Sequence, residues 1–197
     1  MKLYFATGNP HKLDEVKKMI RISLYDMQPM SELGFEGEIQ ETGVTLKENA
    51  LIKARFIHDK YDVNVFSEDT GLQVNALDGA PGVNTARFAG EDKNAENNMK
   101  LLLDQLSDKE DRTATFRTVI ALIMDGEEHI FEGFVNGKIA PDLRGKGGFG
   151  YDPVFIPNGY AKTFAEIHYA IKNEISHRYR AFTKMVEHLK LINKNLI

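Results

Sequence analysis

The sequence predicts a mixed α/β fold in which a hairpin extends a central sheet. Three observations predict it: short apolar runs that end in turn signals, segments with apolar residues at helical spacing, and two β-rich stretches on either side of Asp125-Gly126. The chain has 197 residues, of which 42% are hydrophobic, enough for a substantial core. We find no repeat, linker or low-complexity tract, and we predict one domain over residues 1–197.

The pattern along the chain assigns each element. Residues 2–7 are typical of a buried strand, Thr7-Gly8-Asn9-Pro10 breaks it, and residues 11–22 show helical spacing. Thr45 and Glu48 form a capping-box pattern that begins a second helix. The further elements that we expect are a strand over 63–67, a helix over 93–106, strands over 113–124 and 129–135, a loop over 141–151 and a helix from 176 to about 193.

The composition excludes several classes of function. The net charge of −4 disfavours sequence-independent electrostatic binding of nucleic acid. Without cysteine, the chain has no disulfide, catalytic thiolate or Cys-based metal site. No apolar run approaches the roughly 20 residues that span a bilayer, and Gly8-Asn9-Pro10 follows too early for a signal peptide. We expect a cytoplasmic protein with neither a nucleic-acid nor a membrane partner.

The loop from Thr7 to Lys12 is a candidate phosphate site. A loop between a strand and a helix exposes backbone N–H groups at the positive end of the helix dipole. Gly8 lets a ligand approach the backbone closely, and Lys12 adds a positive charge one turn into the helix. The spacing is not that of a Walker loop. The alternative is an ordinary strand–helix turn with a solvated lysine.

Acidic residues in two segments could hold a metal ion. Glu41 lies in a loop, and Glu68-Asp69 comes at the end of the expected strand. Hydrolysis of a polyphosphate requires neutralised oxygens and an activated water. Magnesium neutralises the oxygens and helps to activate the water, and it needs only one or two carboxylates besides the substrate phosphates. Because the chain has 29 acidic residues, solvated loop acids are the alternative.

Two later segments could recognise a base. In the run from Gly145 to Pro153, glycines surround Phe149 and Tyr151, which leaves flat faces accessible for stacking. Ser176 is a good N-cap, so it places His177 and Arg178 in the first helical turn, where cations oppose the dipole and suggest a ligand role. The alternative for residues 145–153 is a structural loop whose buried aromatic side chains only fill space. The alternative for residues 176–178 is a solvated basic turn. We interpret four histidines as surface or packing residues: His58, His129, His168 and His188. Four arginines are most simply solvated: Arg112, Arg117, Arg144 and Arg180.

Six segments in this order resemble the inosine triphosphate pyrophosphatase family, also called Ham1-like. The resemblance runs from about residue 2 to about residue 190. It is carried by Thr7-Gly8-Asn9 with Lys12; Glu41-Thr42-Gly43 with Glu48-Asn49-Ala50 and Lys53-Ala54; Ser67-Glu68-Asp69-Thr70-Gly71-Leu72; Gly79-Ala80-Pro81-Gly82-Val83 with Ala86-Arg87; Phe149-Gly150-Tyr151-Asp152-Pro153; and Lys172-Asn173 with Ser176-His177-Arg178.

The resemblance implies a fold and an activity. The expected fold is a long, twisted mixed sheet with flanking helices, in two lobes around a substrate cleft. The expected enzyme is a homodimer that uses Mg²⁺. It would hydrolyse ITP, dITP and XTP to the monophosphate and pyrophosphate, which keeps these nucleotides out of nucleic acids.

The resemblance also implies site residues. Asp69 would be the catalytic proton acceptor and, with Glu41, a metal ligand. Thr70 would contact the substrate. The remaining substrate-binding residues would be Thr7, Gly8, Asn9, Pro10, His11 and Lys12 for the phosphates, and Phe149, Gly150, Tyr151, Asp152, Lys172, His177 and Arg178 for the base.

Small departures leave the preferred purine open. Asn84-Thr85 replaces a common serine near Ala86-Arg87, and Ile167 replaces a frequent methionine. Two alternatives to the enzyme remain: a catalytically idle nucleotide-binding protein on this fold, and a Maf-type hydrolase of modified pyrimidines or m7GTP. Retention of Lys12, Glu41 and Asp69 argues against the first. The segments 149–152 and 176–178 favour the purine branch over the second.

Overall fold

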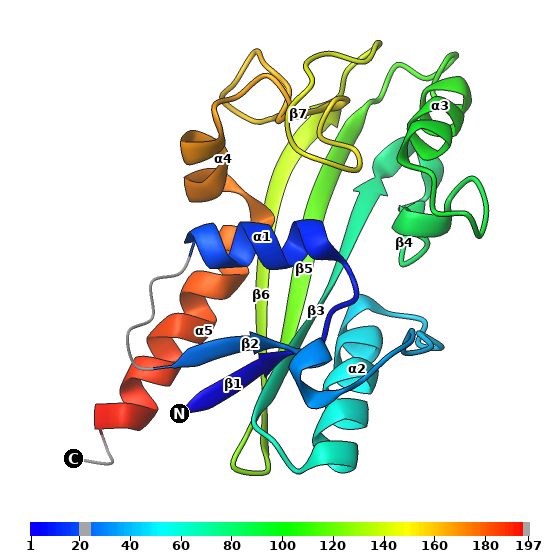
Figure 1. Ribbon diagram of the computed structural model, residues 1–197. Coiled ribbons are helices and arrows are strands. Elements are labelled where there is room, and N and C mark those ends of the chain that lie inside the picture. The colour runs from blue at the N-terminus through cyan, green and yellow to red at the C-terminus, as the bar shows by residue number, and fades with distance from the viewer. Residues whose placement is uncertain (20–24, 195–197) are drawn as a thin grey trace. The chain divides into compact units, whose positions relative to one another are not determined.

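The computed structural model describes residues 1–19 and 25–194 (Figure 1). The predicted helix over 11–22 is confirmed as far as Met19, and the rest of it lies outside the described residues. The elements in chain order are β1 Lys2–Phe5, α1 Pro10–Met19, β2 Asp26–Pro29, η1 Met30–Leu33, α2 Leu46–Tyr61, β3 Val65–Val74, η2 Asn75–Leu77, β4 Pro81–Gly82, η3 Thr85–Arg87, α3 Ala95–Gln105, β5 Thr113–Met124, β6 Glu127–Ile139, β7 Phe155–Pro157, α4 Tyr169–Ile175 and α5 His177–Lys194.

The described residues form a seven-stranded mixed sheet in the order β2-β1-β3-β5-β6-β7, with β4 paired to β3. Strand β1 runs parallel to both β2 and β3, whereas β3–β4 and β6–β7 are antiparallel. The hairpin predicted at Asp125-Gly126 joins β5 and β6, and both residues have positive φ as its turn requires. The predicted mixed α/β class is confirmed.

The chain divides into two compact units, which match the two lobes that the resemblance implies. Unit 1 comprises Met1–Asp69, Thr118–Gly133 and Tyr179–Ile197, and unit 2 comprises Thr70–Arg117 and Phe134–Arg178. Strands β3, β5 and β6 each contribute residues to both units. The single domain over residues 1–197 stays a prediction. Within the described residues, no helix is long and apolar enough to cross a membrane.

Three aromatic rings anchor unit 1 directly beneath its candidate site. Phe5 of β1 stacks on Phe66 of β3 with 4.4 Å between ring centroids, and Phe182 of α5 meets both rings edge-on. All three side chains are buried, and such edge-to-face contacts add to the gain from area burial. Because Phe5 lies two residues before Thr7 and Phe66 two residues before Glu68, the core fixes the base of the Thr7 loop and of the Glu68-Asp69 pair.

Unit 2 has an aromatic core of its own. Phe116 packs on Phe155 and Phe164, and the imidazole of His177 stacks almost parallel on Phe116 at 4.6 Å between centroids. These rings come from β5, β7, the loop before α4 and the start of α5. The packing therefore ties the first residues of α5 to the sheet of unit 2.

Three local expectations need correction. Strand β3 continues to Val74 instead of ending at residue 67, so Asp69 lies within the strand. Helix α4 was not expected, and Ser176, the predicted N-cap of the C-terminal helix, also terminates α4. Arg112 is not simply solvated, because its guanidinium donates to the carbonyl groups of Leu106, Ile139 and Ala140.

Candidate active site

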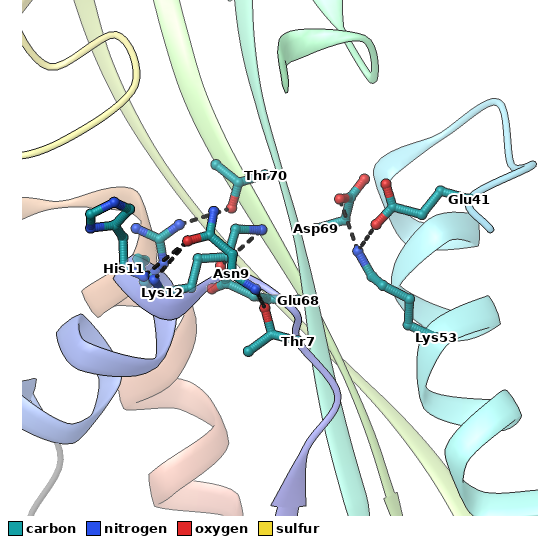
Figure 2. Close-up of polar contacts among 10 residues, drawn as sticks. Thr7, Asn9, His11, Lys12, Glu41, Lys53, Glu68, Asp69 and Thr70 are labelled. Carbon is teal, nitrogen blue, oxygen red and sulfur yellow. Dashed lines mark hydrogen bonds and ion pairs between the residues drawn. The ribbon is translucent and has the colours of Figure 1, made fainter. Parts of the chain in front are cut away.

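The loop between β1 and α1 is closed by its own side chains (Figure 2). Asn9 N–H donates to Thr7 Oγ1 at 3.1 Å, and the N–H groups of His11 and Lys12 donate to Asn9 Oδ1 at 3.0 and 3.4 Å. Pro10, the first helical residue, lacks an N–H and suits that position. Two of the N–H groups that we expected to be exposed, those of His11 and Lys12, are thus capped by Asn9, which fixes the shape of the loop.

Lys12 reaches a buried carboxylate on the neighbouring strand. Its Nζ atom lies 3.2 Å from Glu68 Oε1, and the Glu68 side chain is fully buried. A buried charge without a partner costs several kcal/mol, and this ion pair compensates part of that cost for Glu68. The contact also fixes the direction of Lys12 relative to β3.

Lys53 joins the two predicted metal ligands (Figure 2). Its ammonium group donates to a Glu41 carboxylate oxygen and, at 3.1 Å, to Asp69 Oδ1. The Lys53 and Asp69 side chains are both 9% exposed. The sequence analysis did not select Lys53 as a site residue. The signal was present, because this lysine falls on the helix face that buries Ala50, Ala54 and Ile57.

Helix α2 is held in place over the turns that precede Lys53. The predicted capping box is confirmed: Glu48 N–H donates to Thr45 Oγ1, and Thr45 N–H donates to Glu48 Oε2. Ser67 Oγ donates to Ala50 O at 2.5 Å, which links α2 to β3 one helical turn before Lys53.

A close approach at Gly43 positions the loop that carries Glu41. Gly43 N–H donates to the buried Asn49 Oδ1 at 2.8 Å. A Cβ at Gly43 would lie 2.6 Å from Glu48 Cβ, which is too close for any other residue without movement. Glycine therefore lets the loop pack tightly against the start of α2, two residues after Glu41.

The electrostatic environment of Asp69 suits proton transfer. Burial raises the pKa of Asp69, Lys53 and Lys12 partly offset that effect, and Glu41 adds to it. Burial lowers the pKa of Lys53, but the carboxylates of Asp69 and Glu41 outweigh burial and raise it overall. Lys53 is therefore a stable ammonium beside a carboxylate with raised proton affinity, an arrangement typical of catalytic sites.

The donor set around Lys53 fits magnesium. Within residues 1–19 and 25–194, no group of three or more His, Cys, Asp or Glu residues is arranged to hold a metal ion. Glu41 and Asp69 nevertheless converge on one cation, the Lys53 ammonium. Magnesium prefers hard oxygen ligands and takes the rest of its shell from water and substrate phosphates, so two carboxylates suffice.

Unit 2 brings together the second set of predicted residues. Lys172 Nζ donates to Asp152 Oδ2 at 2.6 Å, and both side chains are buried. Phe149 N–H donates to the same oxygen at 2.8 Å. Gly148 has φ +70°, and a Cβ there would lie 1.9 Å from Asp152 Oδ2, so the turn requires glycine. The Asp152 carboxylate thus holds the loop and the α4 lysine in one arrangement.

Arg178 completes this set from the start of α5. Its guanidinium carbon lies 5.4 Å from the centroid of the Phe149 ring, and Lys172 Nζ lies 5.3 Å from the same centroid. Arg178 Nη2 also donates to Thr70 Oγ1 at 3.4 Å. Arg178 is only 2% exposed, so its charge has been removed from water at a high cost unless partners compensate it.

The two aromatic residues of the glycine-rich loop differ in exposure. Phe149 is half-buried, whereas Tyr151 belongs to the core of unit 2 and is 4% exposed. The Tyr151 hydroxyl donates to Thr85 O at 2.9 Å, and burial raises the pKa of Tyr151 well above its usual value. The expectation that Tyr151 offers an open ring face is therefore wrong.

Every predicted site residue belongs to one of these two sets. Within unit 1 lie the Thr7–Lys12 loop, Glu41 and Asp69. Within unit 2 lie Thr70, the residues from Phe149 to Asp152, and Lys172, His177 and Arg178. The chain passes from one set to the other at the peptide bond between Asp69 and Thr70.

Known proteins with a similar sequence and structure share one family. The profile of the Ham1 family matches residues 3–188. A dITP/XTP pyrophosphatase of Porphyromonas gingivalis is 50% identical over 189 residues, which cover 95% of this chain and 97% of that protein. One of Christiangramia forsetii is 46% identical, covering 96% of this chain and 99% of that protein. The structure of a HAM1 protein from Coxiella burnetii has a TM-score of 0.90 at 35% identity, covering 96% of this chain and 98% of that one.

Proposed function

This chain belongs to the Ham1 family, and we propose that it hydrolyses dITP, ITP and XTP to the monophosphate and pyrophosphate with Mg²⁺. The observation that carries the proposal is the convergence of Glu41 and Asp69 on one buried cation beside the Thr7–Lys12 loop. The relatives at 46% and 50% identity are named dITP/XTP pyrophosphatases, which supports the same substrate class.

The residues of unit 1 have distinct tasks in this reaction. Bound Mg²⁺, held by Glu41 and Asp69, would neutralise phosphate oxygens and make water more acidic. Asp69, whose pKa burial raises, accepts a proton from the attacking water. The water oxygen forms a new P–O bond as the anhydride bond between the α- and β-phosphates breaks, and pyrophosphate leaves. Lys12, directed by Glu68, places a positive charge near the phosphates.

Two observations weigh against the alternatives. An idle nucleotide-binding protein gains nothing from two carboxylates that share a buried lysine, because anionic oxygens repel a triphosphate. A Maf-type hydrolase of modified pyrimidines would not need the Lys172–Asp152 pair and Arg178 around Phe149, which we assign to a purine ring. The base of m7GTP is itself a purine, so the substrate comparison below separates that activity.

A pyrophosphate-release assay tests the proposed function. ITP, XTP, GTP, ATP and m7GTP are compared with Mg²⁺ and with EDTA. We expect rapid release from ITP and XTP in Mg²⁺, slow release from the other three, and none above background in EDTA. Binding of a nucleotide without release of pyrophosphate would favour the catalytically idle protein. A preference for m7GTP would favour the Maf-type hydrolase. Full activity in EDTA would show that the reaction needs no divalent metal.

Lys12→Ala is expected to raise KM for ITP by roughly tenfold with a smaller effect on kcat, because a phosphate contact acts partly in the ground state. Steady-state kinetics of pyrophosphate release measure both constants. Lys47→Ala, an exposed lysine on α2, is the control and should behave as wild type. A wild-type KM in a folded Lys12→Ala protein would show that Lys12 does not contact the phosphates.

The homodimer and the cytoplasmic location that the resemblance implies form part of the same proposal. Sedimentation velocity of the purified protein tests the homodimer, because it reports the mass of the particle, which for a dimer is twice that of one chain. Fractionation of the source cells tests the cytoplasmic location.

A further inference from the structure

Lys53 is a single ammonium group that two carboxylates share. It contacts Glu41 and lies 3.1 Å from Asp69 Oδ1. We propose that Lys53 is a displaceable internal cation, which holds Glu41 and Asp69 together in the metal-free protein and releases both when the divalent metal binds. The inference rests on the proposed function, which assigns the metal to these two carboxylates.

The carboxylates need a cation whenever the metal is absent. Asp69 is buried and Glu41 is partly buried, and two carboxylates that contact one ammonium group repel each other strongly when no cation separates them. The neighbouring cation, Lys12, contacts the buried Glu68 at 3.2 Å. Lys53 donates to both Glu41 and Asp69 and so keeps the pair assembled.

Glu41 and Asp69 cannot bind the Lys53 ammonium group and a divalent metal at the same time without repulsion between the two cations. A divalent ion bound to these oxygens would face the ammonium group within a few ångströms. Repulsion between like charges at that range in a protein site is large enough to change an affinity by more than an order of magnitude. Lys53 must therefore leave when the metal enters.

The fold allows this movement to be confined to one side chain. The capping box and the contact between Ser67 and Ala50 hold the backbone of α2 over the turns that precede Lys53. The lysine side chain has four flexible carbons and can turn its ammonium group without moving the helix. A triphosphate offers the released ammonium a new anionic partner. Metal binding should consequently be weak without nucleotide and stronger with it.

Binding of Mn²⁺ alone, followed by water-proton relaxation without nucleotide, tests the proposal. Lys53→Met removes the charge at similar length, and it should bind Mn²⁺ on the order of tenfold more tightly than wild type. Lys53→Arg keeps the charge and should retain the weak affinity. Lys47→Met on the same helix is the matched control and should also match wild type. Unchanged or weaker binding by folded Lys53→Met would overturn the proposal.

Thermal unfolding separates this role from a purely structural ion pair. Without metal, Lys53→Met should melt at a lower temperature than wild type, because Glu41 and Asp69 lose their cation. Saturating Mn²⁺ should restore more stability to Lys53→Met than it adds to wild type. If Mn²⁺ does not restore the melting temperature that Lys53→Met loses, Lys53 is not a displaceable cation.

A measurement on the wild-type protein covers the case in which Lys53→Met does not fold. Lysines are acetylated with and without saturating Mg²⁺, and the modified positions are quantified by mass spectrometry. Labelling of Lys53 should be slow without metal and increase with it, whereas labelling of Lys47 should not change. Equal labelling of Lys53 in both conditions would overturn the proposal.

These measurements need neither nucleotide nor turnover, so they separate the two claims. If ITP is hydrolysed with Mg²⁺ while Lys53→Met binds Mn²⁺ no more tightly, only the displaceable cation is wrong. If Lys53→Met binds Mn²⁺ more tightly but ITP and XTP are not hydrolysed, the proposed function is wrong and the role of Lys53 is retained.

Discussion

Asp69→Asn is expected to lower kcat for ITP by about 10²- to 10⁴-fold while the protein keeps its fold. Asparagine has nearly the same shape but can neither accept the proton of the attacking water nor contribute a charge to the metal site. Its Oδ1 atom can still accept the hydrogen bond from Lys53, which keeps Glu41 as its charged partner. The loss should therefore appear in turnover far more than in stability.

Pyrophosphate release at saturating ITP measures this effect, and a melting curve confirms folding. Asp62→Asn is a matched control: Asp62 is exposed at the end of α2 with φ +51°, a conformation that asparagine also tolerates. It should retain wild-type kcat. If Asp69→Asn retains more than about half of the wild-type kcat, Asp69 is not the proton acceptor.

Arg178→Ala is expected to reduce ITP turnover sharply and to narrow the preference for ITP over ATP by about ten- to a hundredfold. ITP carries a 6-oxo acceptor, whereas ATP carries a 6-amino donor. A guanidinium can only donate, so against ATP the buried Arg178 would face another donor. Phe149 would stack on either purine and so add affinity without selectivity.

The ratio of kcat/KM for ITP to that for ATP checks this prediction. Arg178→Met, which fills more of the buried volume, should narrow the ratio as Arg178→Ala does. Arg180→Ala, two residues further along α5 and exposed, should leave it at the wild-type value. A wild-type ratio with reduced ITP activity in the Arg178 variants would assign Arg178 to phosphate binding instead of base recognition.

The residues assigned to the base differ in how their charges are compensated. The resemblance assigns both Lys172 and Arg178 to the base, where each could only donate, but the structure pairs Lys172 with Asp152 at 2.6 Å. A buried ion pair is expensive to break, because removal of one partner leaves an unpaired charge in the core. The Lys172 charge is thus already compensated, and selectivity by unmatched donors depends more heavily on Arg178.

Local rules explain the elements that could be predicted. The capping box at Thr45 and Glu48 and the hairpin turn at Asp125-Gly126 depend on residues at most three positions apart, so their sequence patterns are sufficient. The end of β3 could not be predicted in this way. Glu68 and Asp69 look like the polar end of a strand, yet both are buried within it, because Lys12 and Lys53 supply their charge partners.

The sequence by itself determined the mixed α/β class and, through ordered motifs, the residues of the candidate site. Only the tertiary structure decided which of them meet: Lys53 joins carboxylates 12 and 16 residues away, and Arg178 reaches Thr70 across 108 residues. It also decided that Tyr151 is core while Phe149 keeps part of its ring exposed. The physical reason is the separation along the chain between the residues that interact. Turns and caps are satisfied by neighbours in the chain, whereas burial and charge pairing depend on residues that only the packed sheet and helices bring together.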